Sequence, residues 1–436
     1  MSRRLGFALA LILVAASQAQ TPALFQSPRH IPVGRQPVHV ELADVNADGK
    51  LDVLVANSQD GTITVLLGDG HGGVSPAPGS PFAAGPEPND IAIADFNHDG
   101  HLDLAIANHT VPQFTLLLGD GKGGFHPAPG SPFTILTKPH SHGIAAADFN
   151  GDGNIDVAIE SWAEDKVTVV LGDGKGSLAT PGTQYAVGRH PYERLRAADM
   201  DGDGRPDIVT ANFEGANITV LLSDPPNPRS GRDTLHPSAP NLRDPRSSLR
   251  DLRVRSSGVG FQSARFHEAP GSPYACPPNP FAHALADVNG DGKPDVVVAH
   301  YSGHATDPSK DAVSVLLNVA GKDGRRLGQA TRYDAGHLPI AVAVGDINGD
   351  KHPDIAVANM RPPQQLQNRP LPGTPVGGGG VTVLLGDGHG AFRTAGFWAT
   401  GRGPASIAVG DLNGDGKADV VTADTEANQI TILLAR

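Results

Sequence analysis

The sequence predicts an all-β chain that folds as a seven-bladed β-propeller with four-stranded antiparallel blades. A nine-residue motif, DxNxDGxxD, recurs along the chain and begins at Asp44, Asp95, Asp148, Asp199, Asp287, Asp346 and Asp411. Short runs of Val, Ile and Leu flank every copy and are bounded by Gly, Asp and Asn, which is typical of strands rather than helices. One sheet of about 50 residues cannot bury both of its faces, whereas seven sheets arranged radially bury one another.

Each repeat contains four predicted strands. The first precedes the motif, as in residues 91–94, and its small Ala and Gly residues suit the crowded innermost position. The second follows the motif, as in residues 102–107, and the third is represented by residues 62–67. A Gly-Asp-Gly turn then leads to a fourth segment that contains proline, such as residues 127–133. Proline lacks an N–H group for a central ladder, so this strand is expected at the sheet edge.

The two ends of the chain predict how the ring closes. The last repeat stops at residues 433–436, after its third strand. Residues 24–34, at the other end, read like a fourth strand, and IPVGRQP at 31–37 resembles WATGRGP at 398–404. We therefore expect the N-terminal strand to complete the last blade and to remove the open sheet edge.

The first 19 residues are typical of a secretory signal peptide. Arg3 and Arg4 precede an apolar stretch at residues 5–16, and Ser17-Gln18-Ala19 offers a cleavage site. The stretch is too short to cross about 30 Å of hydrocarbon, and no later segment is long and apolar enough. We expect a secreted or periplasmic protein in which residues 20–436 form the propeller.

Two longer insertions interrupt the repeats. Residues 224–258 are rich in Arg and Pro and show no strand or helix period, so we expect disorder there. This segment is interpreted as a solvated loop, with an arm for an anionic partner as the alternative. Residues 360–380, which end in four glycines, are expected to form a flexible loop, and residues 301–311 a shorter extension.

The repeated motif carries the predicted metal chemistry. Positions one, three, five and nine present side-chain oxygens, position seven presents a backbone carbonyl, and glycine at position six permits a sharp turn. These hard oxygen ligands on a short loop favour calcium, with up to seven ions. The predicted ligands are Asp44, Asn46, Asp48, Lys50, Asp52, Asp95, Asn97, Asp99, His101, Asp103, Asp148, Asn150, Asp152, Asn154, Asp156, Asp199, Asp201, Asp203, Arg205, Asp207, Asp287, Asn289, Asp291, Lys293, Asp295, Asp346, Asn348, Asp350, His352, Asp354, Asp411, Asn413, Asp415, Lys417 and Asp419.

The alternative is that these loops are metal-free tight turns. That reading does not explain the aspartate at position nine in every copy, and three or four carboxylates on nine residues would repel each other without a cation. Position twelve, where an EF-hand has glutamate, is Val, Ile or Thr, so these are not EF-hands. Asp201 gives the fourth loop an extra carboxylate. Lys351 replaces glycine in the sixth loop, which is therefore expected to be the weakest of the seven calcium sites.

The amino-acid composition argues against some classes of protein. The chain has 436 residues, a formal net charge of −12 and one cysteine, which argue against nucleic-acid binding and exclude a disulfide framework. Of the 46 acidic residues, 22 lie in the seven motifs. Loss of Arg3 and Arg4 with the signal would give −14, which seven calcium ions would neutralise. The acidity is therefore interpreted as metal ligands rather than as a surface for a basic partner.

The seven motifs, with turns such as GDGKGGF at 119–125, resemble FG-GAP/VCBS repeat proteins, whose repeats also occur at the head of integrin α subunits. The resemblance covers nearly the whole mature chain. It implies a seven-bladed propeller in which calcium clips the hairpin between the first and second strands. It also implies extracellular binding or adhesion, although some members are joined to enzymes or form part of them. An integrin-like stalk and a membrane segment are missing, so integrin-type signalling is not expected.

The face opposite the motifs is the predicted ligand side, because loops around a propeller axis converge on the channel mouth. The candidate ligand-binding residues are His39, Asp90, His142, Glu160, Trp162, Glu193, Arg194, Asn212 and His300. The alternative is that these are ordinary polar loop residues without a role in binding. Glu41 and Arg196 stand where the other five repeats have alanine, and they are expected to line the channel or to meet there.

The sequence contains neither HExxH nor GxSxG, and we expect no enzymatic activity. The preferred function is a monomeric, calcium-stabilised extracellular module that binds a carbohydrate or a protein. The alternative is a propeller enzyme, such as a polysaccharide lyase or a hydrolase, with its site at the channel mouth.

Overall fold

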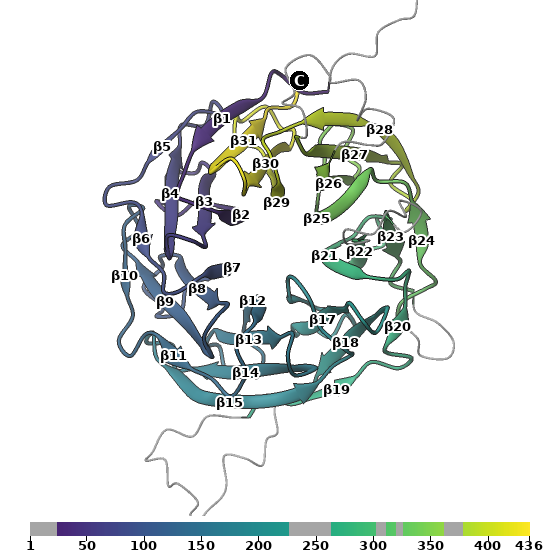
Figure 1. The fold of residues 1–436 in the computed structure, drawn as a ribbon. Coiled ribbons are helices and arrows are strands. Elements are labelled where there is room, and N and C mark those ends of the chain that lie inside the picture. The colour runs from purple at the N-terminus through teal and green to yellow at the C-terminus, as the bar shows by residue number, and fades with distance from the viewer. Residues whose placement is uncertain (1–23, 226–262, 302–310, 320–325, 362–377) are drawn as a thin grey trace, which may run out of the picture.

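The chain forms a ring of seven antiparallel sheets around a central axis (Figure 1). The computed structural model describes residues 24–225, 263–301, 311–319, 326–361 and 378–436, and these contain strands and turns but no helix. The predicted all-β, seven-bladed propeller is confirmed. Within the described residues, no helix is long and apolar enough to cross a membrane.

Blade one shows how the repeat is built. It contains β2 (Pro37–Ala43), β3 (Asp52–Asn57), β4 (Thr62–Gly68), β5 (Val74–Pro76) and β6 (Phe82–Ala83), in the sheet order β2-β3-β4-β5, with β6 also paired to β4. The first strand lines the channel and the proline-bearing segment lies at the outer rim, as predicted (Figure 1). That outer strand is split in two here because the segment between β5 and β6 contains a turn rather than a ladder.

The other blades repeat this order. Blade two contains β7 (Pro88–Ala94), β8 (Asp103–Asn108), β9 (Gln113–Gly119), β10 (Phe125–Pro127) and β11 (Phe133–Thr134), and blade three contains β12 (Ser141–Ala147), β13 (Asp156–Ser161), β14 (Lys166–Gly172) and β15 (Leu178–Ala186). Blade four contains β16 (Arg196–Ala198), β17 (Asp207–Asn212), β18 (Asn217–Ser223), β19 (Phe266–Glu268) and β20 (Tyr274–Ala275), and blade five contains β21 (Pro280–Ala286), β22 (Asp295–His300), β23 (Ala312–Leu316) and β24 (Thr331–Tyr333). Blade six contains β25 (His337–Gly345), β26 (Asp354–Arg361), β27 (Gly380–Gly386) and β28 (Phe392–Ala399).

Blade seven is closed by the N-terminal strand, as the chain ends predicted. It contains β29 (Pro404–Gly410), β30 (Asp419–Asp424), β31 (Gln429–Leu433) and β1 (Arg29–Pro32). β1 pairs antiparallel with β31 in the register Arg29 to Ile432, and a further bridge joins Phe25 to Ala435. Residues from both ends of the chain therefore share one sheet, which leaves no open blade edge between the first and last repeats.

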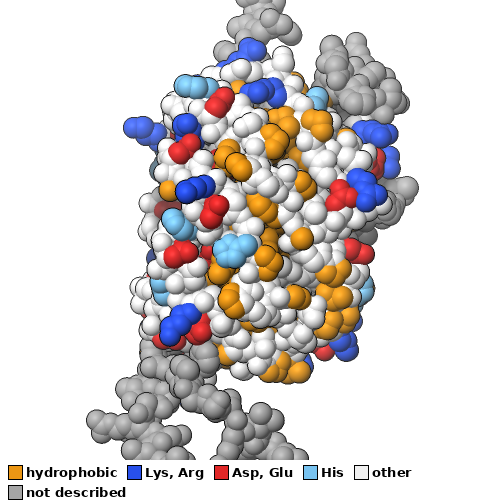
Figure 2. Space-filling view, turned by 90° about the vertical axis from the view of Figure 1, so that its left-hand side faces the viewer, with side chains coloured by type: hydrophobic (Ala, Val, Ile, Leu, Met, Phe, Trp, Pro, Cys, Tyr) orange, Lys and Arg blue, Asp and Glu red, His pale blue; other side chains and the backbone are white. Residues whose placement is uncertain are grey.

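The core lies between neighbouring blades, and the two-residue period of the strands builds it. All six residues of β3 are buried. Val53 and Val55 pack against blade seven, whereas Leu54 and Ala56 pack against blade two. Because alternate side chains point to opposite faces of a strand, the second strand of each blade contributes to the cores on both of its sides. On the rim beside β5, β6 and β10, hydrophobic side chains occupy the middle and charged ones gather toward the two edges (Figure 2).

Some predicted boundaries differ from the structure. The second strand begins at the aspartate of motif position nine, and in blade two it ends at Asn108, one residue later than predicted. β26 extends to Arg361 and β27 begins at Gly380, so both reach into the predicted loop 360–380. The signal peptide, residues 226–258 of the predicted disordered insertion, and residues 362–377 lie outside the described residues.

Candidate functional site

The seven motif loops join the first and second strands, so they all lie at one end of the propeller. In blade three, Asp148 Oδ2 accepts a hydrogen bond from Gly153 N at 2.8 Å, and Asp148 Oδ1 accepts one from Asp152 N at 3.1 Å. Asn150 Oδ1 accepts another bond from Asp152 N at 2.8 Å. The other loops make the same kinds of contact, as in blade seven, where Asp411 Oδ2 accepts from Gly416 N at 2.8 Å. The predicted ligand side chains thus also shape the backbone of the loop.

The aspartate at position nine clamps the loop to the third strand. Asp156 Oδ2 accepts a hydrogen bond from Phe149 N at 3.0 Å, and its Oδ1 accepts one from Gly172 N at 2.8 Å. The equivalent pair of bonds occurs in every blade, at Asp52, Asp103, Asp207, Asp295, Asp354 and Asp419. The carboxylate at this position therefore has a structural role, which is to accept these two hydrogen bonds whether or not the loop binds a metal.

In blades one, two, three and six, the third strand approaches the loop so closely that glycine is favoured at the contact. A Cβ atom on Gly172 would lie 2.0 Å from the carbonyl oxygen of Ile155, and one on Gly68 would lie 2.1 Å from that of Leu51. This close approach explains the first glycine of the repeated Gly-Asp-Gly turn.

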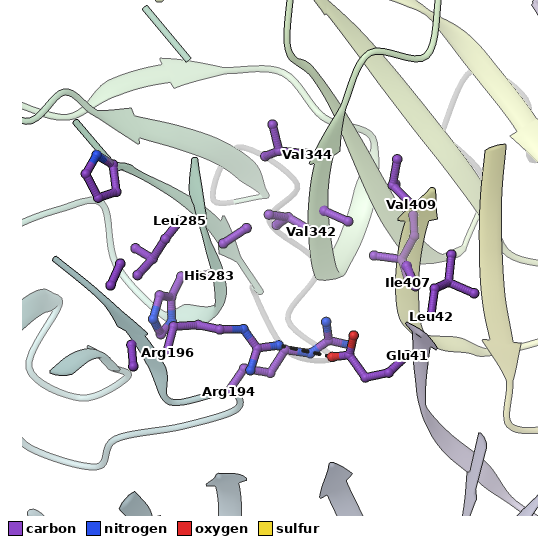
Figure 3. A pocket seen from close by; sticks show the side chains of 16 residues that line it. Glu41, Leu42, Arg194, Arg196, His283, Leu285, Val342, Val344, Ile407 and Val409 are labelled. Carbon is purple, nitrogen blue, oxygen red and sulfur yellow. Dashed lines mark ion pairs between the residues drawn. The ribbon is translucent and has the colours of Figure 1, made fainter. Parts of the chain in front are cut away.

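The inner strands bring charged side chains together in the channel (Figure 3). Arg196 Nη2 lies 3.7 Å from Glu41 Oε1, so the predicted meeting of these two residues is observed. His39 Nε2 lies 3.1 Å from both Glu41 Oε1 and Asp90 Oδ1. Burial opposes ionisation of Glu41, but the hydrogen bond and charge of His39, together with Arg196 and Arg194, lower its pKa to about 2. The result is a mixed-charge cluster that joins blades one, two and four.

Arg194 lies deeper in the same cluster. Its guanidinium donates a hydrogen bond to Ser406 Oγ of blade seven, and the residue is 4% exposed. Burial, with the nearby charge of Arg196, lowers the pKa of Arg194. The backbone that carries it has φ of 52° at His190, 42° at Glu193 and 73° at Arg194. Such left-handed conformations at non-glycine residues cost about 1–3 kcal/mol each and often accompany functional sites.

Two carboxyl groups near this cluster have pKa values close to neutrality. Burial, with the charges of Asp90 and Glu193, raises the pKa of Glu160 to about 8. Burial and Asp90 raise the pKa of Glu193 to about 7, although Arg194 opposes this shift. Neither oxygen of Glu160 has a hydrogen-bond partner among the described residues. Beside the cluster, a cavity of about 350 Å³ is lined by residues that include Glu41, Arg196 and His283 (Figure 3).

Sequence comparison relates this geometry to a known repeat. An FG-GAP-like repeat matches residues 44–106, 101–159, 278–357 and 375–422, and an FG-GAP repeat matches residues 338–384. These stretches cover more than half of the chain and contain six of the seven motif loops. The chain belongs to the FG-GAP repeat family. None of the curated protein sequences matches it significantly.

Solved structures share the fold of this FG-GAP propeller at low sequence identity. The structure of BBS1N in complex with ARL6DN has a TM-score of 0.54 and 10% identity, over 95% of this chain and 96% of that one. A protein from Lactobacillus plantarum has a TM-score of 0.53 and 13% identity, over 85% and 86% of the two chains. Virginiamycin B lyase from Staphylococcus aureus has a TM-score of 0.52 and 10% identity, over 94% and 99%. At these identities the likeness concerns the fold alone.

The donor set of the FG-GAP loops fits a hard divalent cation. In blade four, carboxylate oxygens of Asp199, Asp201 and Asp207 lie within 4.8 Å of one another. Burial is the main cause that raises the pKa of Asp207 to about 6, and the charges of Asp201 and Asp203 add to it. Carboxylates crowded in this way favour an added positive charge, and oxygen-only ligands favour calcium.

Three residues at left-handed positions distinguish individual loops. Lys351, at position six of blade six, has φ of 69° and donates its N–H to Asp346 Oδ2 at 2.8 Å, as glycine does in the other loops. Ala47 and His98, at position four of blades one and two, have φ of 56° and 58°. The sixth loop therefore has the same backbone conformation as the other loops in spite of its lysine. Position four of blades one and two is also strained, which the sequence did not predict.

On the opposite face, the candidate ligand-binding residues Asn212 and His300 are the buried last residues of their second strands. Asn212 Nδ2 donates to Thr219 Oγ1 at 2.9 Å, and His300 Nε2 lies 2.6 Å from Ser314 Oγ. Asn57 donates to Thr64 Oγ1 at 2.8 Å in the same way. The structure thus places Asn212 and His300 in hydrogen bonds within their own blades.

Aromatic and histidine rings surround the channel mouth on blades two to five. Trp162 stacks on His190 at a centroid distance of 4.9 Å, and His142 stacks on Tyr192 at 4.5 Å. His109, which no sequence argument selected, packs against His142 at 4.7 Å. The available signal was its place directly after the last residue of a second strand, where blade three has Trp162. Burial, with the charges of His109 and His140, lowers the pKa of His142 to about 3.

Proposed function

We propose that this FG-GAP propeller is an exported, calcium-stabilised binding module whose ligand site is the channel mouth opposite the motif loops. The ligand is an extracellular carbohydrate or protein. The observation that carries the proposal is the charged cluster of Glu41, Asp90, Arg194 and Arg196, which lies in the channel with aromatic rings at its border. Export rests on the N-terminal signal pattern alone.

The cluster has no evident role in forming the blades. The other five repeats have alanine at the positions of Glu41 and Arg196 and form the same first strand. Burying charges is costly unless they are paired, and even a paired set is often no more stabilising than apolar packing. A group of this kind is therefore better explained by ligand recognition than by stability.

The shape and chemistry of the site suit a polar ligand. The cavity of about 350 Å³ is lined by acidic, basic and imidazole groups together with Val342, Ile407 and other apolar side chains. Trp162 and Tyr192 offer flat faces near the mouth, which could stack on a sugar ring or pack against a peptide. The structure with BBS1N contains a protein partner, which is compatible with a protein ligand for a propeller of this shape.

A glycan array tests the carbohydrate ligand directly. Fluorescently labelled protein lacking residues 1–19 is applied in calcium, and again in chelator. The Arg196→Ala variant restores the alanine of the other repeats and is expected to lose binding. Glu268→Gln, on the exposed outer strand β19, serves as the control. Equal binding by Arg196→Ala, Trp162→Ala and wild type would show that the ligand binds elsewhere.

One observation favours a second candidate, a propeller enzyme such as a polysaccharide lyase or hydrolase. Glu160 and Glu193 have pKa values of about 8 and about 7, in the range useful for general acid–base catalysis near neutral pH. Virginiamycin B lyase shares the fold, which shows only that a propeller of this kind can be an enzyme. A screen of polysaccharides for new reducing ends or unsaturated products tests this candidate, and Glu160→Gln should abolish any activity found.

A further inference from the structure

Three histidine rings meet at the edge of the channel mouth, on the face opposite the motif loops. His109 follows β8 of blade two, and His140 and His142 lie at the start of β12 of blade three. One ring nitrogen of each lies within 4.8 Å of the corresponding nitrogens of the other two. His140 Nδ1 and His109 Nε2 are 3.1 Å apart. Two nitrogens bound to one tetrahedral Zn²⁺, with Zn–N of about 2.0–2.1 Å, are separated by roughly 3.3 Å, so this spacing suits a shared ion.

A carboxylate orients one of these rings. Glu87 Oε2 lies 3.2 Å from His109 Nδ1, so that Nδ1–H donates to the carboxylate and Nε2 carries the lone pair. Nε2 is the nitrogen that faces His140. A histidine that donates its outer N–H to a carboxylate is the usual arrangement behind a metal ligand, because it fixes the tautomer and makes the ligating nitrogen more basic.

The backbone holds His140 between the other parts of the group. Its N–H donates to the carbonyl of His109 at 2.6 Å, and its own carbonyl accepts from Trp162 N at 3.2 Å. The residue has φ of 86°, a left-handed conformation that is uncommon outside glycine. His142 is fixed by stacking on Tyr192 at 4.5 Å. The three rings are therefore preorganised by contacts that do not involve a metal.

We propose that His109, His140 and His142 bind a borderline divalent transition metal such as Zn²⁺. Imidazole suits zinc, copper and nickel, whereas the oxygen-rich motif loops suit calcium, so the two kinds of site select different ions. His140 is exposed and the side chain of His109 is 25% exposed, which leaves room for a non-protein ligand from solvent. Three histidines with an open position form a site that can bind a carboxylate or imidazole of a partner, or a water.

The test uses protein without a histidine tag, with calcium in excess so that the motif loops are saturated. Zn²⁺ binding is measured by calorimetry, and Co²⁺ is used as a spectroscopic substitute whose visible absorption reports tetrahedral nitrogen coordination. We expect one Zn²⁺ per chain bound through these residues. His109→Gln and His140→Gln are each expected to weaken binding roughly tenfold or more, and Glu87→Gln by about tenfold.

Two controls make the result decisive. His389→Gln removes an exposed histidine from the turn between β27 and β28, at the motif-loop end, and should leave Zn²⁺ affinity unchanged. The melting temperature of each variant in calcium verifies folding. The exposed His140 and the half-buried His109 are substituted, rather than the buried His142, so that a loss of core packing does not affect the result. The proposal is overturned if wild type binds no Zn²⁺, or if the His109 and His140 variants bind it as wild type does. Neither outcome bears on the motif loops, which are tested by calcium alone.

Discussion

Arg196 of blade four and Glu41 of blade one form an ion pair in the channel, with Nη2 and Oε1 3.7 Å apart. Arg196 Nη1 also lies 3.8 Å from Asp90 Oδ2 of blade two. These contacts link three blades, and Glu41 and Arg196 stand where the other five repeats have alanine. The pair is partly exposed, at 24% for Arg196 and 30% for Glu41, so water weakens it and leaves both groups accessible to a ligand.

A double-mutant cycle measures this pair. Glu41→Ala and Arg196→Ala each restore the residue of the other repeats, and we expect a coupling free energy of about 0.5–1 kcal/mol from urea unfolding. The coupling should fall as salt is raised, because the pair is partly exposed. A coupling of zero would mean that the two side chains do not interact in solution.

The buried Glu160 predicts a specific pH dependence. Its folded-state pKa of about 8 lies above the ordinary value of 4.5, so the folded state binds more protons than the unfolded state between these values. Stability therefore falls as pH rises from about 4.5 to about 8 and is then level. Glu160→Gln should flatten this fall, so that its stability relative to wild type increases by on the order of 1–3 kcal/mol between pH 5 and pH 8.

Urea unfolding at a series of pH values measures this effect, with calcium in excess throughout. Glu268→Gln removes one exposed carboxylate and controls for the change in net charge. If the difference between Glu160→Gln and wild type were the same at every pH, the raised pKa of Glu160 would be wrong.

The sixth motif loop predicts a stabilising substitution. Lys351 has φ of 69°, where glycine adopts the backbone without steric cost, so Lys351→Gly should stabilise the protein by about 1 kcal/mol and raise the melting temperature by roughly 1–2 °C. Lys293→Gly, in the loop of blade five, is the contrast, because Lys293 is not among the residues with positive φ. It should destabilise slightly through the greater freedom of glycine in the unfolded chain. Differential scanning calorimetry of both variants decides between these outcomes.

The sequence predicted the ring well because its signals are local and repeated. A few neighbouring residues were enough to predict the proline-bearing outer segments and the second strands. They were also enough to show that the last repeat stops after its third strand, at residues 433–436. Contacts between distant residues were beyond such reading. Asp156 meets Gly172 across 16 residues, and His109 meets His140 across 31 and between two blades. For this reason the clamp and the place of His109 beside His140 and His142 appear only in the structure, whereas the meeting of Glu41 and Arg196 was predicted from their departure from alanine.

The clamp and the metal can be separated by two aspartate substitutions in blade three. Asp156→Asn replaces one of two accepting oxygens with an N–H₂ group that faces a backbone donor, and should cost about 1–3 kcal/mol in chelator as well as in calcium. Asp152→Asn keeps the oxygen that accepts from Asn154 N, but removes a charge and the Oδ2 that accepts from Asn150 Nδ2. It should therefore lower stability in calcium more than in chelator. Equal losses for Asp152→Asn in both conditions would show that this loop binds no calcium.

Removal of calcium is expected to destabilise the whole ring. A ligand at about 100 times its dissociation constant stabilises the folded state by about 2.7 kcal/mol per independent site. Several occupied loops should therefore lower the melting temperature by on the order of 10 °C when a chelator is added, and calcium but not potassium should restore it. Atomic emission of the protein after gel filtration in calcium counts the bound ions, with seven as the upper limit set by the motif loops. A melting temperature that does not change on chelation, together with no bound calcium, would leave the position-nine clamps as the sole role of these carboxylates.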